Sequence, residues 1–363
     1  MAIQDAGLFM ATMTLAAAHL DAVRGDNKIR GSPEFFQQKG DTFNKINAKL
    51  KDPNEAISNE VIAAIAMLTM AANLSCNITE FNIHMSAIYR MVQMRGGITA
   101  LGGGDILQIL VGRLDLIHSL NRACPPTFEI TPCCNMVLDR PHILPPEFMG
   151  PISSGDLPPQ LPAGMREVFH GIRYLSTHLE TPRPGQTHYD LMCFSKIRTK
   201  STHELLRLGF PPLSFGGGAE ASLLTPPTAA FELEALRLAA LLYLHCGLHM
   251  FIPFSTARPA VMGGLKAQFF ALLSHFDELA PRELNAVMEQ RATLTWALVV
   301  GSQLAETDTE EALFAKLIAK MVEGQGVEDW QGMEQRLRRI CWVKMLGTVE
   351  RKRVWERVRR GGW

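Results

Sequence analysis

Two histidines one helical turn apart have the spacing in this chain that comes nearest to a metal site. His245 and His249 are separated by three residues, as are two zinc ligands on one face of a helix. Zinc hydrolases of that kind place a glutamate base directly after the first histidine, and Cys246 stands there instead. The flanking residues are almost wholly apolar. We therefore interpret both histidines as part of a helix interior or edge, and predict no metal and no cofactor.

Other signatures of catalysis are missing from the sequence. The glycine runs 102–104 and 216–218 lack the lysine and hydroxyl of a phosphate-binding loop, and no predicted strand precedes them. There is no GxSxG elbow, no HExxH pair and no aspartate-rich metal motif. Titratable residues form no compact set, so we predict that the chain is not an enzyme.

The composition is that of an ordinary globular protein. Apolar residues make up 47% of the 363, charged residues 20%, and Lys+Arg equals Asp+Glu at 36 each. A zero net charge argues against nucleic-acid binding by the chain as a whole. The apolar stretch that Asp5 and Asp21 bracket is interpreted as a core helix, not a signal peptide, and we predict no membrane span.

The seven cysteines are scattered and odd in number, without a CxxC pair. We interpret them as free, mostly buried thiols in a reducing compartment, so the chain is predicted to be intracellular and not secreted.

The elements that must position any site are predicted to be helices throughout, because apolar residues recur at spacings of three and four while alternating strand patterns are missing. The predicted fold is all-α, with about a dozen packed helices in two halves that are joined by a Pro-rich strap and form one composite domain. The halves are 1–122 and 163–363, and the strap is 123–162. Helices are expected at about 2–24, 33–50, 55–73, 79–95, 104–122, 163–180, 187–209, 227–252, 259–278, 281–303, 308–323 and 329–358, with a flexible loop at 210–226.

The stretch 77–102 is the most informative of these elements. Asn77 is placed to cap a helix and Glu80, at its third position, completes a capping-box-like start. One apolar stripe follows, and Gly96-Gly97 supply the left-handed geometry that ends a helix. The stripe consists of Phe81, Met85, Ile88 and Val92. These patterns predict a helix and turn built to pack.

The same stretch resembles the signature of the fungal-specific transcription factor domain, the helical regulatory region that follows the zinc binuclear cluster in many fungal regulators. Ala87 departs from that pattern, since the family usually has glycine there. The segments 7–25, 112–128, 235–248 and 337–358 resemble further pieces of the family in the family's order. The residues that carry the signature are His84, Met91, Val92, Arg95, Gly96, Gly97, Leu101 and Gly102.

The resemblance implies a transcription-regulator-like regulatory domain in the nucleus that acts through protein partners, such as the transcription machinery or a related regulator, or through a small-molecule effector. This sequence holds no six-cysteine zinc cluster, so direct sequence-specific DNA binding is not expected of it. The alternative is an all-α enzyme or a metabolite-binding protein with a pocket between the two halves. His84 is interpreted as a structural histidine that bonds a neighbouring helix end or loop; its functional alternative is a ligand or proton donor. Arg95 is interpreted as a donor to the carbonyl groups of the turn; its functional alternative is the binding of an anionic effector.

The C-terminal segment 331–363 is basic, with ten Arg or Lys residues against three glutamates. Apolar residues interleave with the charges, which favours a closing helix pair with one buried and one solvated face. The solvated face could contact phosphate or an acidic partner, or serve as an import signal. We name its candidate residues Arg351, Lys352, Arg353 and Arg357.

Overall fold

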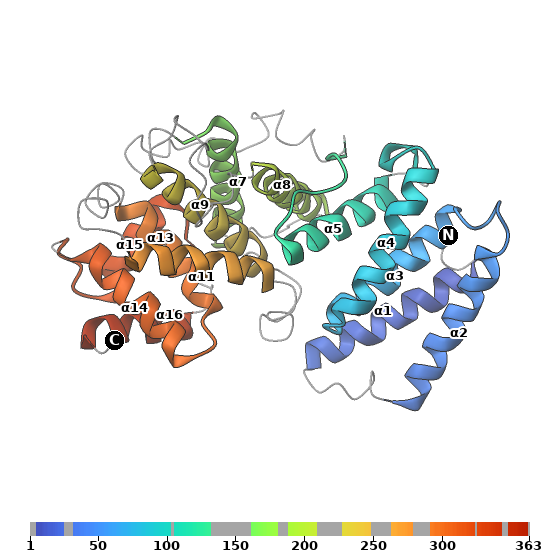
Figure 1. The fold of residues 1–363 in the computed structure, drawn as a ribbon, viewed down its shortest axis with the longest axis horizontal. Helices are drawn as coiled ribbons and strands as arrows, with labels where there is room; N and C mark the ends of the chain where they lie inside the picture. The colour runs from blue at the N-terminus through green and yellow to red at the C-terminus, as the bar shows by residue number, and fades with distance from the viewer. Residues whose placement is uncertain are drawn as a thin grey trace. The chain divides into compact units, whose positions relative to one another are not determined.

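The computed structural model of the protein describes residues 5–24, 32–102, 105–131, 161–180, 188–208, 227–247, 263–278, 291–323, 325–342 and 348–361. These residues form thirteen α-helices and no β-strand, which confirms the predicted all-α class. The chain divides into two compact units, and each is described by itself (Figure 1). Unit 1 comprises Met1–Met136 with His249–Gly264, and unit 2 comprises Val137–Leu248 with Leu265–Trp363.

Unit 1 is built around its third helix, α3 (Asn59–Leu74). Ser58 caps this helix by accepting from the Val61 backbone N–H, which is why it begins four residues later than the predicted residue 55. Twelve of its sixteen residues are buried, and it packs against every other long helix of the unit. These are α1 (Ala6–Arg24), α2 (Pro33–Leu50), α4 (Ile78–Met94) and α5 (Asp105–Arg122), with the short 3₁₀ helix η1 (Ile98–Ala100) between the last two.

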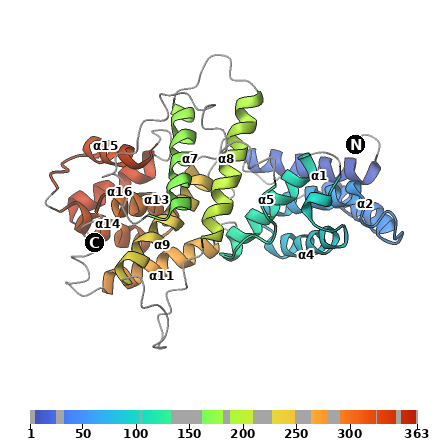
Figure 2. The same ribbon diagram turned by 90° about the horizontal axis from the view of Figure 1, so that it is seen from above.

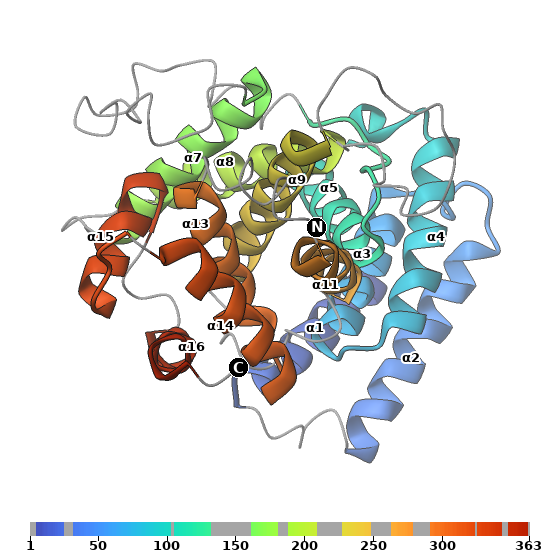
Figure 3. The ribbon, with the colours of Figure 1, turned by 60° about the vertical axis from the view of Figure 1, so that its left-hand side comes forward.

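Unit 2 is built around α13 (Arg291–Gly301), which packs against α9 (Pro227–Leu242), α14 (Asp308–Val322) and α15 (Trp330–Ile340) (Figure 3). Residues Thr293 to Val300 of α13 are all buried. Pro227 begins α9, the first-turn position where its missing N–H costs nothing. The other elements are α7 (Ala163–Glu180), α8 (His188–Arg207), the π-helical turn η4 (Tyr243–Gly247), α11 (Gly263–Glu278, in unit 2 from Leu265 on), the 3₁₀ helix η6 (Ser302–Leu304) and α16 (Thr348–Arg360).

The helix range expected over 329–358 is interrupted, in agreement with the closing helix pair favoured for this segment. Helix α15 ends at Ile340, and Cys341 adopts an extended backbone with φ −169° and ψ 128°. In that conformation the Cys341 carbonyl accepts the indole N–H of Trp296 at 2.6 Å inside the core. The periodicity of the sequence does not reveal the position of this break because its partner lies 45 residues away.

Two further predicted helices differ in detail. The helix expected over 227–252 is α-helical only to Leu242 and then widens into the π-helical turn η4. The helix expected over 281–303 is described from Arg291 onward, and the described part ends in η6. The predicted loop 210–226 and residues 281–290 lie outside the described residues.

The described start of the predicted strap, residues 123–131, contains no helix. Phe128 packs against the core of unit 1, as expected of an apolar residue in a segment that covers the core. Residues 132–160 lie outside the described residues, and with them the apolar Ile143, Leu144 and Phe148.

Candidate functional site

The residues that carry the family resemblance lie on helix α4 and in the segment that follows it, and several of them serve packing. The Asn77 side chain accepts from the Glu80 backbone N–H at 3.1 Å, so the predicted cap is confirmed. The four residues of the predicted stripe have no exposed surface. Met91 and Leu101 are buried beside them, at 7% and 3% exposure. Val92 and these two residues therefore contribute to the core and offer nothing to a ligand.

The turn after α4 has the left-handed geometry that the glycines predict. Gly96 and Gly97 have φ values of +89° and +107°, which side chains other than hydrogen rarely tolerate. Arg95 donates from Nη1 to the Ile57 carbonyl at 2.8 Å and from Nη2 to the Ala100 carbonyl at 3.4 Å. This confirms the interpretation of Arg95 as a donor to carbonyl groups near the turn.

Gly102 closes the signature for a steric reason. A Cβ atom at this position would lie 2.9 Å from Nδ2 of Asn59, the first residue of α3. The absent side chain lets the backbone after η1 approach the start of the central helix.

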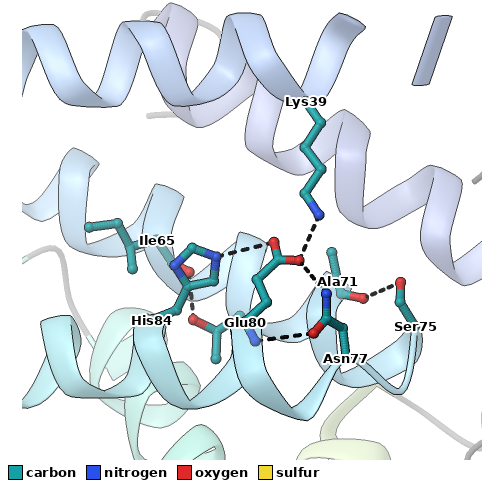
Figure 4. A network of polar contacts seen from close by, with 8 residues as sticks. Lys39, Ile65, Ala71, Ser75, Asn77, Glu80 and His84 are labelled. Atoms are coloured by element: carbon teal, nitrogen blue, oxygen red, sulfur yellow. Dashed lines mark hydrogen bonds and ion pairs between the residues drawn. The ribbon is translucent and has the colours of Figure 1, made fainter. Parts of the chain in front are cut away.

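His84 belongs to a polar network that links α4 to α2 (Figure 4). Its Nε2 lies 3.3 Å from Glu80 Oε1, and Lys39 donates from Nζ to Glu80 Oε2 at 2.8 Å. The same Oε2 accepts from Asn77 Nδ2 at 2.9 Å. The prediction was that His84 bonds a neighbouring helix end or loop. Its partner instead lies one turn earlier in its own helix. The reason is that Glu80 sits at the helix start, where one carboxylate can serve the cap, the lysine and the histidine together.

The carboxylate of Glu80 is the centre of this network. Burial raises its pKa, but the hydrogen bonds from His84 and Lys39, together with their charges, outweigh burial and lower the pKa below the ordinary 4.5. The ionised form is thus the stable one, and each of its oxygens already accepts a hydrogen bond. A group so occupied is suited to fastening two helices and not to general acid–base work.

A second polar cluster, which the sequence analysis missed, lies between α4, α5 and the start of the strap. Asp115 is 1% exposed, and its Oδ1 accepts from Tyr89 Oη at 2.6 Å. Its two oxygens also accept the backbone N–H groups of Thr127 at 3.2 Å and Phe128 at 2.8 Å. His118 Nδ1 lies 3.0 Å from Tyr89 Oη. The sequence signal that could have revealed this cluster is the acidic Asp115 within the largely apolar segment 106–120.

The protons of this cluster can be assigned from donor and acceptor counts. A phenol has one proton, and since the Tyr89 proton goes to the carboxylate, Tyr89 Oη must accept from His118 Nδ1–H. Burial and the charge of Asp115 raise the pKa of Tyr89, which keeps the phenol protonated. Burial and the charge of Arg122 lower the pKa of His118, so the neutral imidazole is favoured. With three donors on Asp115, the arrangement anchors residues 127 and 128 to α5.

Of the two histidines with metal-ligand spacing, the structure describes His245, and this residue bonds a threonine. His245 Nε2 lies 3.0 Å from Thr202 Oγ1, and that hydroxyl donates to the Arg198 carbonyl at 2.9 Å. His245 Nε2 is therefore the donor, and this nitrogen is not available to bind a metal ion. His249 lies outside the described residues. Within the described part of the chain, no three His, Cys, Asp or Glu side chains gather closely enough to hold a metal ion.

The predicted basic face lies on α16, whose apolar side packs against α14. Arg357 donates to the Asp308 carbonyl at 2.6 Å and to its carboxylate at 3.0 Å, and Arg353 lies 3.5 Å from Glu311. Both arginines therefore meet the acidic first turn of α14. The side chains of Arg351 and Lys352 lie outside the described residues.

The thiols follow the prediction only in part. Among the three cysteines that the structure describes as free, Cys341 is buried, Cys124 is half-buried and Cys76 is exposed. Burial raises the pKa of the Cys341 thiol. Cys76 follows α3 with φ +55°, so it stands where the chain leaves the helix and not inside the core.

Among the described residues, α1 alone is long and apolar enough to cross a membrane, by a test that buried core helices and N-terminal signal sequences pass as well. Comparison of the chain with models of protein families, with curated proteins and with solved structures gives no match. The resemblance of residues 77–102 to a regulatory domain therefore stays a prediction.

Proposed function

We propose that the chain is a helical regulatory domain of the transcription-regulator type, without a DNA-reading module in this sequence, that works in the nucleus by binding protein partners. In this proposal it catalyses no reaction and needs no cofactor. A small-molecule effector is the second way in which such a domain would receive a signal.

The observation that supports the proposal most is the turn after α4. Arg95 ties the turn to the segment before α3 through the Ile57 carbonyl, while Gly96 and Gly97 adopt backbone angles that favour glycine. Each of these residues is therefore explained by the structure of the turn, as expected of a signature that maintains a helical scaffold. A scaffold whose signature residues serve packing is suited to presenting a surface, so its activity would lie in what binds to it.

The polar clusters of unit 1 support the same proposal. Glu80 and Asp115 have their oxygens occupied by donors from neighbouring elements. Both carboxylates fasten one element to another, which is the use expected of buried charges in a rigid binding module.

The direct test is to tether the full chain to a promoter. The chain is fused to an unrelated DNA-binding domain in a fungal host, and expression of a reporter gene is compared with that given by the DNA-binding domain alone. The proposal predicts a reproducible rise or fall in reporter expression. A fusion that accumulates in the nucleus in folded form and leaves the reporter unchanged would contradict it.

Two variants make the test specific to the folded domain. Val92→Asp places a charge in the core of unit 1 and is expected to abolish the effect by unfolding. Ile83→Asp lies on the same helix at 63% exposure, and the effect should survive it unless Ile83 itself touches the partner. The small-molecule effector is tested by a thermal-shift screen, in which a metabolite that binds the purified chain should raise its melting temperature.

A further inference from the structure

One face of α1 is apolar and exposed, although the helix already has a buried face. The core side of α1 packs against α2 and α3. On the opposite side, four large side chains keep 49%, 46%, 40% and 47% of their surface exposed. They are, in that order, Phe9, Met13, Leu20 and Val23.

The spacing of these residues is regular. With the exposed Ala16 between them, they follow one another at intervals of four, three, four and three residues. That is the seam of a coiled coil, in which each side chain inserts between four side chains of a facing helix. We call the five residues from Phe9 to Val23 the α1 seam. A helix on a lipid surface has the same spacing, but its polar face is rich in Lys and Arg. Residues 6–18 of α1 contain neither, so we take a helix as the partner of the seam.

From this seam we propose that α1 pairs with α1 of a second copy of the chain, in antiparallel orientation. The order of side-chain sizes is self-complementary about Ala16. With the two-fold axis there, Ala16 faces Ala16 of the second copy, Met13 faces Leu20, and Phe9 faces Val23. The small residue at the centre allows the two helices to approach closely, and a large side chain meets a small one at each end.

Charge favours the antiparallel orientation. Residues 6–18 contain no ionisable side chain, whereas His19 and Arg24 lie towards the C-terminal end of α1. Parallel pairing would bring the two Arg24 side chains together. Antiparallel pairing places them at opposite ends of the helix pair and opposes the two helix dipoles.

Packing within unit 1 lowers the cost of this association. An isolated helix of this length is marginal in water, because its residues must be ordered before they can pair. Here α1 is held by α2 and α3, so the seam exists before the partner arrives. The pairing goes beyond the proposed function and does not depend on it.

The test measures the mass of the full chain in solution. Light scattering behind size-exclusion chromatography should give twice the 40.2 kDa of one chain at micromolar concentration. Leu20→Glu places a charge in the seam without touching the core and should weaken the dimer at least about tenfold. Ile83→Glu is the matched control: it adds the same charge at an exposed apolar residue of α4, a helix that lies on the other side of unit 1 from α1 (Figure 2), and α3 contacts both helices. Its dimer should equal that of the parent chain.

A cross-link tests the geometry independently. Ala16→Cys should give a disulfide-linked dimer under mild oxidation in higher yield than the parent chain, since the proposed axis passes through this residue, and Ile83→Cys should not. A monomeric parent chain, or a dimer that Leu20→Glu leaves intact, would overturn the proposal. If the monomer then floats with phosphatidylcholine vesicles and Leu20→Glu abolishes flotation, the seam meets lipid instead; if it does not float, the seam is covered within one chain.

Discussion

Each unit of the molecule holds a glutamate at a contact between two helices, and the pKa values of the two carboxyl groups are shifted in opposite directions. In unit 1, Glu80 of α4 faces Lys39 of α2 and His84 of its own helix. In unit 2, Glu232 of α9 is 3% exposed, and the hydrogen bond described for it comes from the Thr293 hydroxyl of α13, at 3.1 Å. The donors of Glu80 include a lysine ammonium group, whereas the donor described for Glu232 is a neutral hydroxyl.

The difference appears in the pKa of each group. The pKa of Glu80 is lowered, because donors and positive charge outweigh burial. Burial raises the pKa of Glu232 from 4.5 to about 7, and the Thr293 hydrogen bond offsets only part of the rise. The arginine of the same helix, Arg237, pairs with Glu234 through contacts of 2.7 and 2.6 Å. A buried carboxyl is thus kept charged where its neighbours supply charge, and is kept protonated where they do not.

The distribution of tryptophan allows the two units to be followed separately. All five tryptophans, at 296, 330, 342, 355 and 363, belong to unit 2. Tryptophan fluorescence therefore reports unfolding of unit 2, while far-UV circular dichroism reports both units. The predictions that follow use this separation.

The largest effect is expected from Glu232→Gln. Because the folded pKa of about 7 lies above the unfolded 4.5, the folded state binds a proton that the unfolded state releases. The free energy of unfolding of unit 2 should therefore fall as the pH rises from 4.5 to 7, by up to about 3 kcal/mol. The glutamine variant lacks this fall and should be the more stable chain at pH 8. Urea unfolding followed by tryptophan fluorescence at pH 5 and pH 8 measures the difference.

The control for this measurement is Glu328→Gln, an exposed glutamate of unit 2. It should follow the pH dependence of the parent chain, since it leaves Glu232 and Thr293 unchanged. Equal pH dependence in the Glu232→Gln and parent chains would show that Glu232 is ionised in the fold, and the contrast with Glu80 would disappear.

The second effect concerns the donor. Thr293→Val keeps the shape of the side chain and removes the hydroxyl that donates to Glu232. We expect a loss of about 1 kcal/mol at pH 5, where the acceptor is neutral, and about 2 kcal/mol at pH 8, where it is charged. Tryptophan fluorescence is again the measurement. In the double variant with Glu232→Gln, the pH dependence of this loss should vanish; a loss that still grows with pH would mean that another group near Thr293 titrates.

What the sequence predicts of this contrast is limited by distance along the chain. The cap of α4 and the turn at Gly96 depend on residues within four positions of one another, so pattern alone predicts them. The Lys39 contact with Glu80 joins residues 41 apart, and the Thr293 contact with Glu232 joins residues 61 apart. No periodicity encodes which side of one helix will meet which side of another.

The helix boundaries follow the same rule. The ends of α2, α4 and α5 lie within about two residues of the prediction because caps and glycines fix them locally. The position of the break at Cys341 was not predicted, since it depends on a tryptophan in α13. The Asp115 cluster was missed for the same reason, as its donors come from α4 and from residues 127–128.

The third effect is a pH dependence of the opposite sign in unit 1. Glu80 contributes stability above its unfolded pKa of 4.5, and this contribution is lost as the pH falls through its lowered folded pKa. Glu80→Gln should cost about 1 kcal/mol at pH 7 and progressively less below pH 4. The change should appear in circular dichroism and leave tryptophan fluorescence unaltered. A cost that is independent of pH would assign the role of Glu80 to packing.

The smallest effect is that of the lysine alone. Lys39→Met keeps an unbranched apolar side chain and removes the ammonium group, which lies 2.8 Å from Glu80 Oε2 and 5.8 Å from the centre of the Phe43 ring. The lysine is 21% exposed, and an ion pair so close to solvent contributes about 0.5 kcal/mol, which 1 M salt should largely abolish. Lys45→Met, at an exposed position of the same helix, provides the control and should change stability less. If the loss at Lys39 persisted in 1 M salt, the hydrogen bond to Glu80, and not the charge, would be what fastens α2 to α4. The two glutamates would then differ in the number of their donors alone.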